Sequence, residues 1–232
     1  MKKRLFYLFT FIFFVICSSA QNVDKPASST DTVTDIDGNV YKTVKIGKQW
    51  WMAENLKVTH YRNGEIIPNV SDDKVWFNLK TSASCCYRND TAYVVIYGRL
   101  YNKYAAVDGR KIAPKGWHVP TDDEWQLLVD YLGGDSIAGG KMKSTGTIEA
   151  GNGLWHGPNE GATNESGFSA LPGGGRTFDA ADHVDGSFAY FWSTKKYHMY
   201  YGWHRYLSSK SPLIYRYNYY NQFGFSIRCV KD

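Results

Sequence analysis

The segment that most constrains the fold of this chain is its ending, Gly224–Val230, which is followed only by Lys231 and Asp232. Apolar residues alternate with polar ones along it: the apolar positions are Phe225, Ile227 and Cys229, and the polar positions are Ser226 and Arg228. Side chains of a strand point alternately to its two faces, so this pattern predicts a half-buried strand that is the last structural element. We therefore expect a closed domain whose final strand completes its core.

The first 20 residues are typical of a secretory signal peptide. Basic residues at positions 2–4 precede an apolar run of about 13 residues, Leu5–Cys17, and small residues follow up to Ala20. A membrane-spanning helix needs roughly 20 apolar residues, so we predict cleavage after Ala20 rather than an uncleaved anchor, and no transmembrane span afterwards. The large residues directly before Cys17 argue against a lipid anchor. We expect export to the periplasm, the outer surface or the extracellular space.

The net charge and the length of the mature chain indicate which partners it can bind and how many domains it forms. Three of its 27 Lys and Arg lie at positions 2–4, so signal removal leaves 24 against 22 Asp and Glu. A nearly neutral chain lacks the excess of basic residues with which proteins bind nucleic acids. Residues 21–33 are polar and are predicted to form a flexible tether. Residues 34–232 are long enough for a single domain with a substantial core.

Three cysteines remain after signal removal: Cys85, Cys86 and Cys229. An exported protein can keep a disulfide, and two adjacent cysteines rarely bond to each other because the peptide between them is strained. We therefore expect Cys229 to pair with Cys85 or Cys86. The alternative is three reduced, buried thiols.

Local patterns predict an α+β fold with short antiparallel strands, one well-formed helix and long glycine-rich ordered loops. The helix, Thr121–Leu132, begins with a capping box of Thr121 and Glu124 and carries an apolar face at helical spacing. A shorter helix near residues 137–144 is weakened by two glycines. Residues 146–185 form the long loop region. The predicted strands are Val40–Ile46, Gln49–Ala53, Ala189–Thr194, Gly202–Ser208 and Gly224–Val230, the first two as a hairpin.

Aromatic residues are concentrated near the end of the chain, mixed with Arg, His and Asn. Aromatic faces stack on sugar rings or on partner side chains, and Tyr, Trp and Arg dominate binding hot spots. The candidate ligand-binding residues are Tyr200, Trp203, Arg205, Tyr215, Tyr217 and Tyr219. The alternative is that alternate residues pack inside the domain and the others merely cover a sheet. The expected partner is a glycan or an envelope protein.

No sequence pattern indicates catalysis. The six histidines lack a zinc-site spacing, and the chain has no nucleophile elbow and no phosphate-binding glycine loop. Asn164 and Glu165 are of the type that ligates calcium in sugar-binding lectins, but we expect them to bond loop backbone groups instead. We therefore predict no catalytic residues, no metal ligands and no cofactor.

Seven segments, in order along the chain, resemble one known family. They are Thr34–Tyr41, Trp51–Leu56, Tyr97–Asn102, Gly116–Thr121, Gly161–Phe168, Leu171–Gly174 and Gly224–Val230. On these segments the chain resembles the Fibrobacter succinogenes major paralogous domain, found in exported bacterial proteins, from about residue 34 to its end. The resemblance implies a C-type lectin-like core, a fold group that also contains the formylglycine-generating enzymes. It implies no established reaction, so no catalytic residues are carried over.

Two positions depart from the family's pattern. Similar proteins often carry a cysteine just before Gly116–Thr121, where this chain has Ala113–Lys115, and an aromatic residue in place of Cys86. Which cysteine pairs with Cys229 therefore stays open. We expect an exported, non-catalytic binding module. The alternatives are an enzyme related to the formylglycine-generating proteins, using Cys85 and Cys86, and a purely structural envelope or adhesion component.

Overall fold

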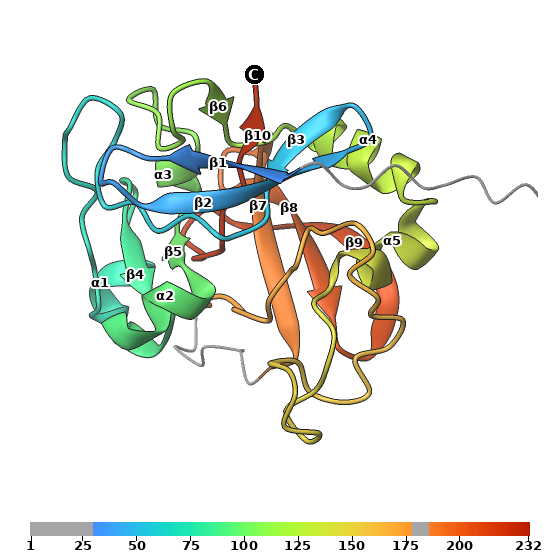
Figure 1. Cartoon of the computed structure of the whole chain (residues 1–232). Helices are drawn as coiled ribbons and strands as arrows, with labels where there is room; N and C mark the ends of the chain where they lie inside the picture. The colour runs from blue at the N-terminus through green and yellow to red at the C-terminus, as the bar shows by residue number, and fades with distance from the viewer. Residues whose placement is uncertain (1–29, 178–185) are drawn as a thin grey trace, which may run out of the picture.

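Figure 1 shows the computed structural model of the chain, which describes residues 30–177 and 186–232. The predicted signal peptide and residues 21–29 of the predicted tether lie outside these residues. The described part contains antiparallel sheets and short helices, so the domain is α+β, as predicted. A five-stranded sheet crosses the upper part of the view and a three-stranded sheet lies below it. No helix in these residues is long and apolar enough to span a bilayer.

Most elements are short, apart from the three strands near the end of the chain. The five-stranded sheet has the order β1-β2-β3-β10-β6 and consists of β1 (Thr30–Thr34), β2 (Val40–Ile46), β3 (Gln49–Met52), β10 (Val230–Lys231) and β6 (Trp117–His118). The other sheets consist of β4 (Ser84–Cys86) with β5 (Arg99–Tyr101), and of β7 (Phe188–His198), β8 (Tyr201–Ser208) and β9 (Ser211–Tyr220). The helices are α1 (Asp73–Phe77), η1 (Tyr87–Asn89), η2 (Thr91–Tyr93), α2 (Val94–Tyr97), α3 (Lys103–Ala106), α4 (Asp122–Tyr131) and α5 (Asp135–Met142).

The N-terminal strands confirm the predicted hairpin and correct the predicted tether. β2 and β3 pair antiparallel around a turn in which Gly47 has a φ of +60°, a left-handed conformation that glycine adopts without strain. Residues 30–33, assigned to the tether from their polar composition, form most of β1 instead. β1 pairs with β2 over its whole length, from Thr30 opposite Val44 to Thr34 opposite Val40. Its side chains are mostly exposed, because β1 is an edge strand.

The predicted helix is confirmed as α4, and its cap is the one expected. Thr121 Oγ1 accepts a hydrogen bond from Glu124 N at 3.1 Å, and Glu124 Oε2 accepts one from Thr121 N at 2.8 Å. α5 follows, and its two glycines have a structural reason. A Cβ on Gly139 would lie 2.2 Å from the carbonyl oxygen of Leu213, so α5 and β9 approach closely only because the position is glycine.

Residues 146–177 of the predicted loop region are packed by buried side chains rather than by regular structure, and residues 178–185 lie outside the described residues. Between α5 and β7 the described residues form no helix and no named strand. They bury Trp155 and Phe168 completely, and the Phe168 ring lies 5.9 Å from that of Trp51 and 5.8 Å from that of Trp125. Asn164 Oδ1 accepts a hydrogen bond from Ser169 N at 2.9 Å, a backbone contact within the loop of the kind expected.

The three-stranded sheet contains two of the predicted strands and one strand that was not predicted. β7 and β8 include the predicted segments 189–194 and 202–208, but the strand that pairs with β8 is β9, Ser211–Tyr220. The tyrosine-rich segment itself is therefore the third strand. The reason is local: β8 and β9 follow each other directly in sequence, so they form a hairpin with little loop to close.

The C-terminal segment is more deeply buried than its alternation predicts. Only Val230–Lys231 form a named strand, and Phe225 and Ser226 make single bridges to Tyr101 and Phe191. All seven residues of Gly224–Val230 are buried, including the polar ones. The prediction of a half-buried strand was wrong because the segment runs between elements on all sides, so neither face reaches solvent.

The predicted disulfide is not formed. Cys85, Cys86 and Cys229 are thiols with exposed fractions of 1%, 4% and 0%, and no disulfide joins them in the part of the chain that the structure describes. Cys229 packs in the core that contains Tyr41 and Trp192, whereas Cys85 packs in a separate small cluster with Trp76. The alternative of three reduced, buried thiols is the arrangement observed.

This arrangement predicts the outcome of thiol counting. A full-length Cys17→Ser variant purified without reductant should leave its thiols unlabelled by a maleimide while folded, since only the exposed thiolate reacts and burial raises the pKa of Cys229 well above its ordinary value. In denaturant without reductant, mass spectrometry should count three labels. A count of one would mean that two of the three cysteines have formed a disulfide after all.

Candidate functional site

The predicted ligand-binding tyrosines of β9 lie on one face of the three-stranded sheet. Tyr215, Tyr217 and Tyr219 are separated by one residue each, and a strand points every second side chain to the same side. Tyr217 is 55% exposed and Tyr219 is 36% exposed, while Tyr215 is half-buried. β9 is the last strand of its sheet; α5 packs against its start near Leu213, and the exposed rings, those of Tyr217 and Tyr219, lie further along the strand.

The row continues across the sheet onto β8 and β7. Tyr206 stands opposite Tyr215, with ring centroids 4.5 Å apart and an interplanar angle of 8°. Tyr190 lies 5.7 Å from Tyr206 and 5.8 Å from Phe188. We call this surface the aromatic face: it consists of Phe188, Tyr190, His204, Tyr206, Tyr215, Tyr217 and Tyr219.

His204 forms the buried base of the aromatic face. Its ring stacks on Tyr219 at 5.2 Å with an interplanar angle of 12°, and neither ring nitrogen has a hydrogen-bond partner among the described residues. Burial, with the nearby positive charges of Lys103 and Arg205, lowers the pKa of His204 to about 3. The imidazole is therefore neutral at physiological pH and acts as one more aromatic ring of the stack.

Trp203 and Arg205 were predicted to share this surface, and they do not. Both belong to β8, but they alternate with His204 and Tyr206 and so point to the opposite face of the sheet. Trp203 is half-buried against Arg216, whose guanidinium carbon lies 3.5 Å from the centroid of the Trp203 ring. Arg205 is only 1% exposed, so it offers no contact to a ligand.

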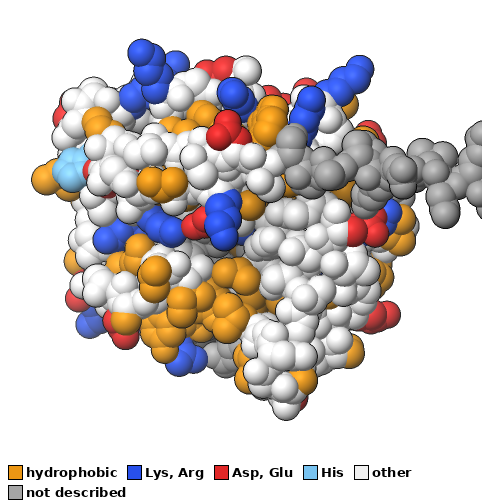
Figure 2. Space-filling model, in the orientation of Figure 1, with side chains coloured by type: hydrophobic (Ala, Val, Ile, Leu, Met, Phe, Trp, Pro, Cys, Tyr) orange, Lys and Arg blue, Asp and Glu red, His pale blue; other side chains and the backbone are white. Residues whose placement is uncertain are grey.

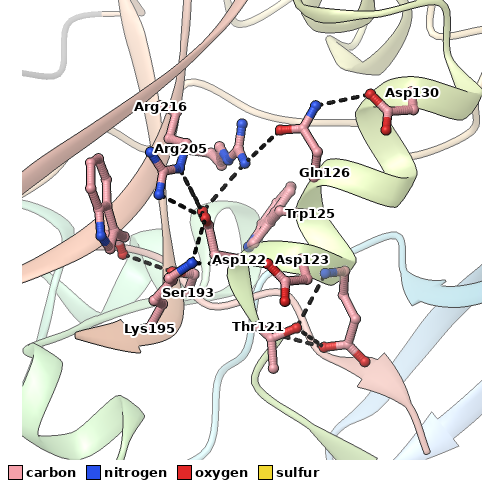
Figure 3. A network of polar contacts seen from close by, with 12 residues as sticks. Thr121, Asp122, Asp123, Trp125, Gln126, Asp130, Ser193, Lys195, Arg205 and Arg216 are labelled. Atoms are coloured by element: carbon pink, nitrogen blue, oxygen red, sulfur yellow. Dashed lines mark hydrogen bonds and ion pairs between the residues drawn. The ribbon is translucent and has the colours of Figure 1, made fainter. Parts of the chain in front are cut away.

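Arg205 instead belongs to a charge network centred on Asp122, the first residue of α4 (Figure 3). Asp122 accepts hydrogen bonds from Arg216 Nε at 2.9 and 3.1 Å and from Arg205 Nη2 at 3.3 Å, while Lys195 Nζ lies 3.8 Å away. Gln126 Oε1 accepts a further bond from Arg205 Nη2 at 3.1 Å. Burial lowers the pKa of Arg205, and the charge of Asp122 opposes that shift. The network ties α4 to β8 and β9.

Tyr200 lies apart from both faces, in the turn between β7 and β8. It is 53% exposed and has Tyr197 and Met199 nearby in sequence, which are 57% and 71% exposed. Of the six candidate residues, the structure thus brings together only the three tyrosines of β9. The other four residues of the aromatic face, His204 and Tyr206 of β8 and Phe188 and Tyr190 of β7, were not among the candidates. Phe188 and Tyr190 alternate along β7. Their alternation before Trp192 was a signal of a same-face row, but nothing local showed that it would join the tyrosines of β9.

The aromatic face consists of phenol, phenyl and imidazole rings. The described residues include no group of three or more His, Cys, Asp or Glu side chains arranged to hold a metal ion. Cys85 and Cys86 are consecutive residues of β4, opposite Leu100 and Arg99 of β5, so their side chains point to opposite sides of the strand. The aromatic face can bind by stacking and by the phenol hydroxyl groups at its edge.

The fold and the site define an α+β domain with one aromatic sheet face. Comparison with family models then identifies the family: residues 44–231 match the model described as the Fibrobacter succinogenes major domain, and the chain belongs to this family. The resemblance inferred from the seven sequence segments is confirmed at this level. Neither the curated proteins nor the solved structures gave a match.

Proposed function

We propose that this chain is an exported, non-catalytic binding module whose aromatic face binds carbohydrate. The observation that carries the proposal is the row of Tyr215, Tyr217 and Tyr219 on an exposed edge strand. Sugar rings present C–H groups that pack on the electron-rich face of an aromatic ring. Same-face residues of a strand are spaced about 7 Å apart, so the row offers contacts to successive rings of a glycan.

The proposal includes a C-type lectin-like arrangement of the core and export through the predicted signal peptide. Two features support that arrangement. β3, near the start of the domain, pairs with β10 at its end, with Trp51 opposite Val230. After α5, residues 143–177 form a long loop without regular structure that buries its own Trp155 and Phe168.

A glycan array tests the proposal directly. The protein is applied to plant and bacterial glycans with and without calcium, beside a Tyr217→Ala variant and a matched control, Tyr131→Ala. Tyr131 is a 63% exposed tyrosine of α4, which packs on the other side of the sheet. Tyr217→Ala should weaken binding about tenfold or more, as loss of an interface anchor does, and Tyr131→Ala should bind as the wild type. A blank array, or equal loss in both variants, would contradict the proposal.

A second candidate, adhesion to an envelope protein, is favoured by a different surface. Figure 2 shows hydrophobic side chains gathered over the α2 region of the molecule. Val95 and Ile96 of α2 are 74% and 44% exposed, and Val75 of α1 is 52% exposed. Contiguous apolar surface of this kind marks interaction sites. If this surface is the functional one, Val95→Asp should abolish retention on isolated cell envelopes, whereas Tyr217→Ala should leave it unchanged.

A further inference from the structure

A hollow of about 300 Å³ lies away from the aromatic face, where the loop after α3 meets β6 and the start of α4. Its walls are largely apolar and include Val107, Ile112, Ala113, Trp117 and Val119. Its volume is at the low end of small-molecule pockets, so it suits a ligand of about a dozen non-hydrogen atoms. It shares no residue with the aromatic face.

The two acidic side chains that line the hollow, those of Asp108 and Asp232, are already paired. Arg110 Nη2 lies 2.8 Å from Asp108 Oδ2, and its Nε donates to Asp108 Oδ1 at 2.9 Å. His118 Nδ1 lies 2.6 Å from Asp232 Oδ1, and His118 Nε2 lies 2.8 Å from Glu124 Oε1. Burial disfavours the charged imidazolium, but these two hydrogen bonds outweigh it and raise the pKa of His118. The acidic side chains of the hollow are therefore already paired with cationic or hydrogen-bonding groups and do not favour a cationic ligand.

The two remaining cations of the lining have no carboxylate partner among the described residues. Arg62 donates from Nε and Nη2 to the backbone carbonyls of Ala113, Pro114 and Trp117, which are uncharged. Lys111 is an exposed residue of the lining, and its side chain makes no ion pair with a carboxylate of the described residues. Lys111 also has a φ of +61°, a left-handed conformation that is uncommon for lysine. This conformation belongs to the turn in which Lys111 N donates to the carbonyl oxygen of Asp108 at 3.0 Å.

We propose that this hollow binds a small organic carboxylate. The apolar body of the ligand packs against Trp117 and Ile112, and its carboxylate pairs with Lys111, beside the charge of Arg62. A monoanion with an apolar body matches the site better than inorganic phosphate, because the walls are apolar and a more highly charged, strongly hydrated ion would lose its water there without replacement. This site is independent of the proposed glycan surface.

Protein-observed NMR of the full chain tests the proposal. Four probes are titrated: benzoate, phenylacetate, 4-methylpentanoate and indole-3-acetate, each beside its uncharged amide. At least one acid should saturate with a Kd of about 1 mM or tighter, and should shift the indole signal of Trp117 and backbone signals within residues 107–121. The matching amide should bind about tenfold more weakly, because a charge-assisted hydrogen bond is lost.

Substitutions at Lys111 and Lys115 distinguish binding in the hollow from nonspecific attraction between opposite charges. Lys111→Gln should weaken the acid about tenfold, Lys111→Arg should retain binding, and Lys115→Gln should match the wild type. Lys115 is an exposed lysine four residues further along that does not line the hollow. The proposal is overturned if none of the four acids saturates, if the amide binds as tightly as the acid, if no shift falls on the residues that line the hollow, or if Lys111→Gln binds like the wild type. The amide comparison uses the wild-type chain, so it decides the question even if a variant misfolds.

Discussion

Replacing Arg228 by Met is expected to lower the free energy of unfolding by about 4 kcal/mol and the melting temperature by about 10 °C. Arg228 is 1% exposed, and its guanidinium donates to Asn55 Oδ1 at 2.7 Å, to the carbonyl oxygen of Ser169 at 3.0 Å and to that of Phe168. Burial lowers the pKa of Arg228 to about 9, which still leaves it charged at neutral pH.

The expected loss comes from the groups that Arg228 leaves behind. Methionine fills a similar volume, so a cavity contributes little, but the acceptors from two distant segments stay buried without a donor. Asn55 follows β3, and Phe168 and Ser169 belong to the glycine-rich region, so one side chain joins three parts of the chain.

Denaturant unfolding monitored by circular dichroism measures this effect. Lys231→Met is the matched control, since Lys231 is exposed in the same terminal segment and should change stability by less than about 0.5 kcal/mol. Arg228→Lys should fall between the two, because it keeps the charge and loses the planar fork. A loss below 1 kcal/mol in Arg228→Met would show that these bonds do not stabilise the fold.

Asp122→Asn is expected to cost about 3 kcal/mol of unfolding free energy. The substitution is nearly isosteric, but it leaves the buried guanidinium of Arg205 without an anion, while Arg216 and Lys195 lose theirs at the surface. Solvent screens the attraction of Asp122 for Arg216 and Lys195, since their side chains are 35% and 49% exposed, so these two pairs contribute less to the loss than Arg205 does.

The control separates this network from the general effect of a charge at a helix N-terminus. Asp123→Asn removes a charge from the same first turn of α4, but its side chain is 91% exposed, so the change should stay below about 1 kcal/mol. A double variant, Asp122→Asn with Arg205→Met, should recover much of the loss, because it removes the buried unpaired charge. Additive losses in the double variant would rule out coupling between Asp122 and Arg205.

The network and the aromatic face lie on opposite sides of the same two strands. Arg205 and Arg216 hold β8 and β9 to α4, while Tyr206 and Tyr215, the next residues on those strands, stack on the other side. A rigid support behind an exposed row of rings preserves their spacing, which reduces the ordering cost of binding.

The features that the sequence by itself determined are those fixed by neighbours in the chain. The capping box of Thr121 and Glu124 starts α4 because both partners lie within one helical turn, and the turn at Gly47 joins β2 to β3 because glycine accepts a positive φ. The tyrosines of β9 share a face for the same reason, since a two-residue period needs no distant partner.

Only the tertiary structure decided which face each strand buries and what meets it there. Side chains of β8 alternate between its two faces, and the sequence of β8 does not indicate which face is buried. It therefore could not place Arg205 in the interior and Tyr206 on the aromatic face. The C-terminal segment was predicted to expose one face to solvent, but the elements around it cover both faces. Arg228 is therefore buried, and it bonds to two other segments of the chain. The presence of three cysteines made a disulfide possible, but Cys85 and Cys229 pack in separate clusters of the fold. Burial depends on contacts between residues far apart in the chain, and that information is absent from any short window of sequence.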